Sequence, residues 1–231
     1  TPDGRFAFFT NTGRFPRNAV HKLLIEARPT GSLMCVDLKT GAVQTLVFGL
    51  VMPNGVTLTH KGDALLLVTL FGLARVPLPM APGGGQVDAE ALARGESLPL
   101  EATLIQRDFQ GTPDNIRRRQ GPGSGQASSG TYLVALGSKR AAPFSLPQLI
   151  APWPTLRKAC GLLGLEAMVR LISRSCTLVE VDEDGRVVET MADEKAACFW
   201  PSEAEERDGY IYIGSWRAPF LARAKISHLR T

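Results

Sequence analysis

The sequence is poor in the residues and motifs that most readily identify an enzyme class. It has only four cysteines, Cys35, Cys160, Cys176 and Cys198. They form no C-x-x-C pair and show no zinc-ligand spacing, so we expect no zinc site, and the redox state of the thiols stays open. A G-x-S-x-G nucleophile elbow is absent as well, because Pro122 stands where that motif needs glycine before Ser124.

Histidine and dense positive charge are also scarce. His21, His60 and His228 fall in a predicted loop, a turn and the C-terminal tail, which indicates surface histidines rather than an acid/base pair. The net charge is +4, and the one dense basic run is 117–119. This run lacks interleaved aromatic residues and adjoins a Gly/Ser-rich stretch, so we predict a solvated loop and no nucleic-acid partner.

The sequence does contain one short pattern in four copies. Each copy opens on a turn glycine, continues with mostly apolar residues and closes on small or polar ones, at 4–10, 62–69, 130–136 and 209–215. Such short apolar runs predict strands that are buried on both faces. With 44% hydrophobic and 21% charged residues, the 231-residue chain is expected to bury a sizeable core.

Further strands are predicted beside each copy. Partner strands are expected at 32–37, 73–78, 177–182 and 220–226, and third strands at 42–48, 102–107 and 186–191. Hairpin turn residues join several of them. Repeated four-stranded antiparallel meanders predict an all-β fold, a β-propeller with blades at roughly 1–48, 49–110, 111–193 and 194–231.

Two inserts interrupt this pattern. The first, 79–99, is predicted to be a connector with a short helix at 88–94. The second contains a helical insert at about 152–174, which starts near Pro154 and is apolar nearly all round. It is shorter than the roughly 20 apolar residues that span a bilayer. Two alternatives stay open: a lid packed on the propeller, or a segment that dips into a membrane surface with Trp153 and basic ends as anchors.

Two matching turns precede or open short strands. Pro53 is followed by Asn54, and Pro113 is followed by Asp114. Proline presets φ and keeps the preceding residue extended, so each turn delivers an oxygen-bearing side chain to the mouth of a strand. In a radial arrangement of blades, Asn54 and Asp114 would point at a common axis. The alternative is that both residues only cap their turns.

Several stretches together resemble the strictosidine synthase-like family, most closely its adipocyte plasma membrane-associated branch. They occur in family order and cover essentially the whole chain. They are Phe8-Phe9-Thr10-Asn11, Arg28-Pro29-Thr30-Gly31, Pro53-Asn54-Gly55-Val56, Pro113-Asp114-Asn115-Ile116 and Asp208-Gly209-Tyr210-Ile211. The resemblance implies a six-bladed propeller, with two further blades and an anchor upstream of Thr1. It also implies membrane association in the endoplasmic reticulum or secretory pathway.

The resemblance further implies a chemistry. Related gluconolactonases and paraoxonases bind calcium in the central channel and hydrolyse lactones or aryl esters. By this resemblance Asn54 and Asp114 match calcium-ligand positions, with Asn115 beside them, and carboxylate and amide oxygens suit calcium. A small-molecule ester or lactone would be the substrate. Asn11, which replaces the aspartate usual in the family, and Trp200 would line the channel.

The stretch at 200–203 departs from the family. Strictosidine synthases carry a catalytic glutamate six residues before the Asp-Gly that matches Asp208-Gly209, and here that position is Ser202. Glu203 is one residue along and is expected on the opposite face of a regular strand. This argues against amine–aldehyde condensation. The leading hypothesis is a calcium-dependent hydrolase with Glu203 and Ser202 as catalytic residues. A non-catalytic membrane-associated propeller that binds a partner or lipid is the alternative.

Overall fold

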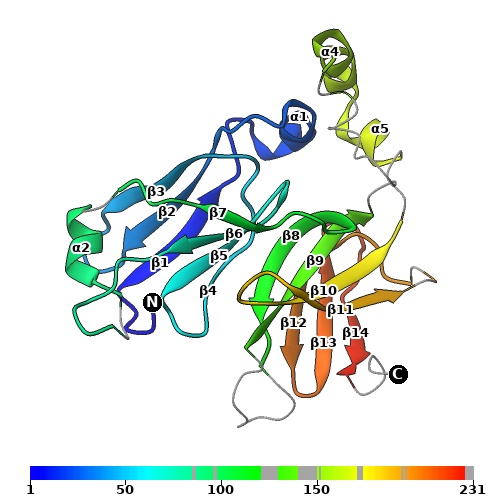
Figure 1. The fold of residues 1–231 in the computed structure, drawn as a ribbon. Helices are drawn as coiled ribbons and strands as arrows, with labels where there is room; N and C mark the ends of the chain where they lie inside the picture. Colours follow the sequence, from blue (N-terminus) through cyan, green and yellow to red (C-terminus); the bar gives the residue numbers. More distant parts are fainter. Residues whose placement is uncertain are drawn as a thin grey trace.

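The chain folds into four antiparallel sheets that follow one another in sequence. The computed structural model describes residues 1–84, 87–95, 98–120, 130–139, 150, 152–170, 174–193, 195 and 197–226. Each sheet is a meander in which consecutive strands are neighbours. Figure 1 shows the sheets in order, from the blue strands near the N-terminus to the red strand near the C-terminus. The predicted all-β propeller fold is confirmed, with these four sheets as its blades.

The sheets contain three or four strands each. The first contains β1 (Phe6–Asn11), β2 (Gly31–Asp37) and β3 (Val43–Leu50). The second contains β4 (Val56–Leu58), β5 (Ala64–Thr69), β6 (Gly72–Pro77) and β7 (Thr103–Gln106). The third contains β8 (Gly111–Arg118), β9 (Thr131–Lys139), β10 (Cys176–Asp182) and β11 (Val187–Asp193). The fourth contains β12 (Pro201–Arg207), β13 (Tyr210–Ser215) and β14 (Ala222–Lys225).

The hydrophobic core lies between successive sheets. Strand β5 shows this most clearly, because it is buried along its whole length. Leu65 and Leu67 join the cluster shared with the first sheet, whereas Leu66 and Val68 join the cluster shared with the third. Alternate side chains of a strand point to opposite faces, so one continuous apolar run serves two neighbouring sheets. The predicted burial on both faces is confirmed for this strand.

The basic run at 117–119 is not a solvated loop, so that prediction is wrong. Arg117 and Arg118 belong to β8, and Arg119 follows with only 3% of its side chain exposed. The Arg119 guanidinium binds the buried carboxylates of Glu180 and Glu206, the latter at 2.7 Å. A guanidinium is tolerated in the interior when carboxylates compensate its charge. Because Glu180 lies in β10 and Glu206 in β12, this ion cluster links the third and fourth sheets.

Helix α2 (Ala89–Arg94) confirms the short helix predicted at 88–94. The Asp88 side chain accepts a hydrogen bond from the Ala91 N–H at 2.9 Å, which satisfies one of the free donors at the start of the helix. Gly95 ends the helix in the left-handed conformation. Leu92 is fully buried against the first two sheets, so α2 closes the outer edge of that core.

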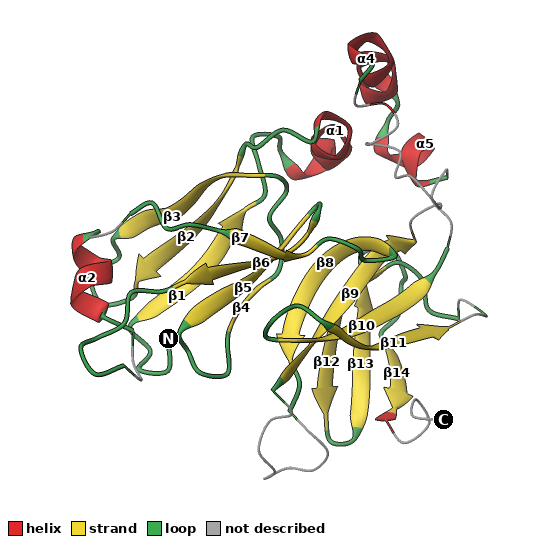
Figure 2. Cartoon of the chain, in the orientation of Figure 1, coloured by secondary structure: helices red, strands yellow, loops and turns green. Residues whose placement is uncertain are grey.

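Three other helices lie together at one end of the sheets, as Figure 2 shows. One is α1 (Val20–Glu26), which follows a 3-10 turn at Arg17–Ala19 and was not predicted. His21 is buried in α1, so the prediction of a surface histidine in a loop is wrong. The reason is that alternate residues of this short helix, His21 and Leu23 among them, turn inward. His228 lies outside the described residues.

The insert after β9 forms two short helices rather than one. They are α4 (Pro154–Leu162), which begins where predicted, and α5 (Leu165–Val169). None of the residues of α4 is fully buried, but α4 packs on α1, where the half-buried Cys160 contacts the small cluster of Ile25 and Ile150. In contrast, Val169 of α5 is buried, and Glu166 forms an ion pair with Arg217. In the described part of the chain, no helix is long and apolar enough to cross a bilayer.

Candidate functional site

The two matching proline turns meet at the helix-bearing end of the sheets. The Asn54 side-chain amide donates a hydrogen bond to Oδ1 of Asp114. The backbone supports the same contact, because the N–H of Gly55 donates to the carbonyl of Asp114 at 3.0 Å and the N–H of Asn54 donates to Val68 at 2.9 Å. The structure therefore brings these two predicted site residues together from the second and third sheets.

A glycine makes this close approach feasible. A Cβ at Gly55 would lie 2.6 Å from the Cα of Asn115, closer than side-chain atoms come in folded proteins. The first sheet reaches the same place through Thr10, whose hydroxyl donates to the Asn54 carbonyl at 2.8 Å. Asn11 lies next along β1, but its side-chain oxygen accepts the N–H of Gly13 at 3.3 Å and so serves its own turn.

The negative charge of the Asp114 carboxylate is poorly compensated by its surroundings, because its hydrogen-bond donor is the neutral amide of Asn54. Its Oδ2 lies beside Gly137, where an added Cβ would be only 3.4 Å away. Burial raises the pKa of Asp114 to about 7; the hydrogen bond from Asn54 opposes this and the negative charge of Glu203 adds to it. A carboxyl group with this pKa exists in both protonation states near neutral pH. Such perturbed groups concentrate at functional sites.

The fourth sheet contributes the other face of the site. The Asn115 side-chain amide donates to the Ser202 carbonyl at 2.8 Å. Glu203 forms an ion pair with Arg117 at 2.7 Å. Burial raises the pKa of the Glu203 carboxyl, although the Arg117 charge lowers it in part. The predicted residues Asp114, Asn115, Ser202 and Glu203 therefore form one group.

The strand geometry corrects one prediction about Glu203. Pro201 pairs with Ser215 and Glu203 pairs with Gly214, so a register shift lies between Pro201 and Glu203. Such a bulge places two residues opposite one on the partner strand and interrupts the alternation of faces. Strand β12 is therefore not regular at this point, and the strict alternation of faces assumed for Ser202 and Glu203 does not apply there. The carboxylate present at this bulge is that of Glu203.

Trp200 lies directly before this bulge. It is buried, its φ is 50°, and its ring stacks on Trp216 with the centroids 5.2 Å apart. A bulky residue with positive φ is strained, and such strain persists only where neighbours hold the residue in place. Here the Trp200 N–H donates to the Ser175 carbonyl at 2.9 Å.

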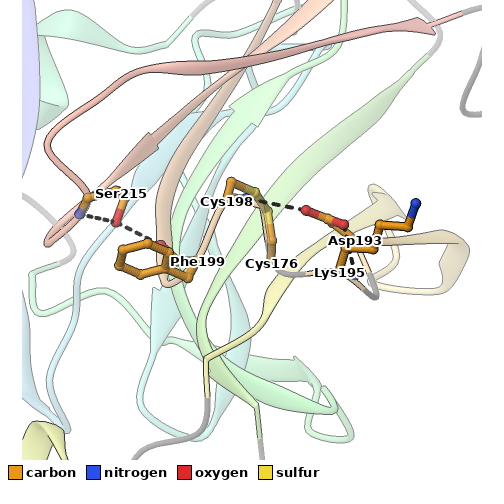
Figure 3. The surroundings of a disulfide bond; sticks show 7 residues. Cys176, Asp193, Lys195, Cys198, Phe199 and Ser215 are labelled. Carbon is orange, nitrogen blue, oxygen red and sulfur yellow. Dashed lines mark hydrogen bonds between the residues drawn. A yellow bond between two sulfur atoms is a disulfide. The ribbon is translucent and has the colours of Figure 1, made fainter.

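Sequence reasoning missed a disulfide close to Trp200. Cys176 and Cys198 form a disulfide bond, with their Cα atoms 5.5 Å apart, as Figure 3 shows. The bond connects the start of β10 to the segment that leads into β12. Sequence reasoning also missed the ion pair of Arg117 with Glu203. A spacing pattern gives no signal for either pairing, because each partner lies on a different sheet or segment.

The oxygen donors at this end fit a hard cation in kind, although they form an incomplete shell. Asp114 has a half-buried carboxylate, and Asn54 and Asn115, whose amide nitrogens donate to Asp114 and to Ser202, each have an amide oxygen. Calcium takes about six to eight oxygen ligands, so other oxygens or water would complete the coordination. The described residues contain no group of three or more His, Cys, Asp or Glu side chains placed to hold a metal. The oxygen-bearing side chains brought together here are thus two amides, the Asp114 carboxylate and the nearby Glu203 carboxylate.

The chain is similar to proteins from animals and plants. It is 30% identical to the adipocyte plasma membrane-associated protein of Gallus gallus over 99% of this chain and 51% of that protein. It is 31% identical to strictosidine synthase-like 10 of Arabidopsis thaliana over 93% of this chain and 52% of that protein. The chain therefore spans about half the length of these relatives.

Other comparisons are less informative. A regucalcin from Agrobacterium tumefaciens, described as a calcium-binding protein, aligns with 93% of this chain and 51% of its own, at 14% identity and a TM-score of 0.49. No protein-family model matches the chain. The identities to the animal and plant relatives, the family stretches in order and the four meanders agree with one another. The chain belongs to the strictosidine synthase-like family of propeller proteins.

Proposed function

We propose that the helix-bearing end of this propeller binds calcium and hydrolyses small esters or lactones. The observation that carries the proposal is the meeting of Asn54 and Asp114 across two sheets. A half-buried carboxylate beside two amide groups is suited to a hard cation and poorly suited to a simple turn cap. The nearby Glu203 carboxyl and Ser202 hydroxyl add groups that can accept or donate protons.

In this proposal, some residues would bind the calcium ion and others would transfer protons or position the substrate. Asp114 would hold the ion with its carboxylate, and Asn54 and Asn115 with their amide oxygens. Calcium, when bound, polarises a carbonyl group and lowers the pKa of a bound water molecule. Glu203, with its raised pKa, would accept the proton of the attacking water while Arg117 orients its carboxylate. The Ser202 hydroxyl would position the substrate, and Trp200 would form the adjoining wall.

Hydrolysis of phenyl acetate and of a γ-lactone tests this proposal. A calcium chelator should reduce turnover by at least about 100-fold, and Asp114→Asn should do the same. The matched control is Asp184→Asn, because Asp184 is an exposed aspartate in the β10–β11 turn and should leave turnover unchanged. Full activity in chelator, or in Asp114→Asn, would contradict the proposal. A condensation product from an amine and an aldehyde would replace it with synthase chemistry.

A second candidate function is that of a non-catalytic propeller held at a membrane. The animal relatives are named as plasma membrane-associated proteins. In and beside α4, large apolar side chains are exposed, with Trp153 at 64% and Leu162 at 87% exposure. Arg157 and Lys158 of the same helix carry positive charge, which favours anionic lipid. The disulfide between Cys176 and Cys198 supports a location in the secretory pathway, where disulfides persist.

Flotation with vesicles of phosphatidylcholine and phosphatidylserine tests this candidate. The chain should float with the vesicles, and the double variant Trp153→Ala/Leu162→Ser should remain at the bottom of the gradient. Leu221→Ser is the matched control, because Leu221 is 65% exposed and lies outside the insert. Equal flotation of the double variant and the control would exclude α4 as the membrane-binding element.

A further inference from the structure

A pocket of about 550 Å³ shares Trp200 with the candidate hydrolase site, but it contains none of the proposed calcium ligands or proton-transferring residues. It is a half-open pocket lined by the α5 region, by Arg174 before β10, and by residues next to β12 and β13. The residues around it share positive charge or an aromatic ring: Arg170, Arg174, Arg217, Phe199 and Trp200, with Glu166 as the one acid. A volume of this size suits a small organic ligand.

The positive charge of the pocket is only partly neutralised. Both nitrogens of the Arg217 fork bind the two oxygens of Glu166, each at 2.7 Å. Arg170 adds its charge next to the same carboxylate. The Arg174 guanidinium lies over the Phe199 ring at 4.9 Å, and within the described ranges it forms no ion pair with a carboxylate. The pocket lining therefore contains three guanidinium groups and one carboxylate, which leaves an excess of two positive charges.

The pocket wall is held rigidly at several points. The Ser215 hydroxyl donates to the Phe199 carbonyl at 2.8 Å and accepts the N–H of Arg217 at 3.1 Å, so one side chain fixes two walls. Figure 3 shows Ser215, Phe199 and the nearby disulfide together. The disulfide ties Cys198, next to Phe199, to Cys176, two residues after Arg174. A preorganised wall lowers the entropy cost of binding.

We propose that this pocket binds an aromatic organic anion. Its carboxylate or phosphate group would be held by Arg174 and Arg217, because guanidinium groups bind both anions in a bidentate manner. Its ring would lie against Phe199, which is half-buried and supplies apolar surface, with the buried Trp200 ring edge-on behind Phe199 at a centroid distance of 5.4 Å. Glu166 occupies the Arg217 fork as an internal anion, and the ligand would displace it. This binding does not require hydrolysis, so it can be tested without turnover.

Titration calorimetry with 2-naphthoate, 2-naphthyl phosphate and 2-naphthol tests the proposal. The two anions should bind, and the neutral naphthol should bind at least about tenfold more weakly. Arg174→Gln and Arg217→Gln should each weaken anion binding about tenfold, as expected for a lost charge-assisted contact. Arg186→Gln is the matched control, because Arg186 is 79% exposed in the β10–β11 turn and should leave the affinity unchanged.

Glu166→Gln provides a sharper test, because it should tighten anion binding by releasing the Arg217 fork. If Glu166 served only to hold α5 in place, its loss would weaken binding instead, and that result would contradict the proposal. Equal affinities for naphthol and naphthoate would exclude an anion site. If inorganic phosphate bound as tightly as 2-naphthyl phosphate, the proposed contact between the ligand's ring and the pocket would be excluded. An unchanged unfolding midpoint for each variant establishes that the fold is intact.

Discussion

Strands β8 and β12 have charged groups near both of their ends, and the carboxyl groups have different partners at the two ends. Away from the helices, Glu206 and Glu180 share the buried guanidinium of Arg119. At the helix-bearing end, Asp114 has the neutral amide of Asn54, and Glu203 has the half-exposed Arg117. The first arrangement compensates its carboxylates with a buried cation. The second does not, and both of its carboxyl groups have raised pKa values.

The two ends of these strands are therefore expected to have different roles: one stabilises the fold, and the other can bind protons or a ligand. A compensated buried ion cluster fixes how two sheets pack, and it is costly to break. The Asp114 carboxyl, whose pKa is raised to about 7, can gain or lose a proton near neutral pH, and a carboxyl group without a buried counter-cation can also bind a metal cation. We therefore expect substitutions at the Arg119 end to change stability, and those at the Asp114 end to change pH dependence and ligand binding.

The largest expected effect comes from Arg119→Met. It would leave Glu180 and Glu206 buried without a cation, so the free energy of unfolding should fall by about 3–5 kcal/mol. Urea unfolding followed by circular dichroism measures this loss. The matched control is Arg117→Met, because Arg117 is 45% exposed and its ion pair should contribute less than about 1 kcal/mol. Equal losses in the two variants would remove the contrast between the two ends.

The next effect is a pH dependence at the other end. The pKa of Asp114 is raised to about 7 in the folded chain, so the folded state favours the protonated carboxyl. Its contribution to stability is full below the unfolded pKa near 3.8 and is lost as the pH rises through about 7. A shift of this size corresponds to at most about 4 kcal/mol.

Asp114→Asn should abolish this decline, and urea unfolding at about pH 4.5 to 8.5 measures it, because most of the decline between pH 3.8 and about 7 falls within that range. Calcium should oppose the decline in the unmodified chain, because a bound cation favours the ionised form. Asp184→Asn should keep the original pH profile. Parallel profiles for the unmodified chain and Asp114→Asn would show that Asp114 is not the responsible group.

A somewhat smaller effect is expected from the disulfide at the helix-bearing end. The double variant Cys176→Ser/Cys198→Ser opens a loop with a sequence separation of 22 residues, which should lower the free energy of unfolding by about 3 kcal/mol. Cys160→Ser, at a free and half-buried cysteine, should change it by less than about 1 kcal/mol. If the double variant and the unmodified chain bind 2-naphthoate with equal affinity, the disulfide does not organise the anion pocket.

The strands could be predicted from the sequence because local features determine them. Glycine-bounded apolar runs located β1, β5, β9 and β13, and the run in β5 also indicated burial on two faces. Helix α1 could not be predicted in this way. Its seven residues have no side-chain cap, and it is stabilised by contacts with α4 and α5, which follow more than a hundred residues later.

The site could be predicted only in part. Asn54 and Asp114 were recognised because their turns match and a repeat places equivalent turns at one axis. Arg119 was misassigned because the composition of the following stretch suggested a loop, whereas its environment is set by carboxylates on other strands. The face of β12 on which Glu203 lies could not be predicted, because it depends on a bulge in this strand. No residue there gives a distinctive bulge signal.

The contact between the two proline turns has a consequence for how this site can be altered. The Gly55 N–H reaches the Asp114 carbonyl, so main-chain atoms set the spacing of positions 54 and 114 whatever side chains they carry. The double exchange Asn54→Asp/Asp114→Asn should therefore keep the geometry while moving the formal negative charge from the third sheet to the second. The propeller thus provides a fixed frame in which the position of one charge can be varied on its own.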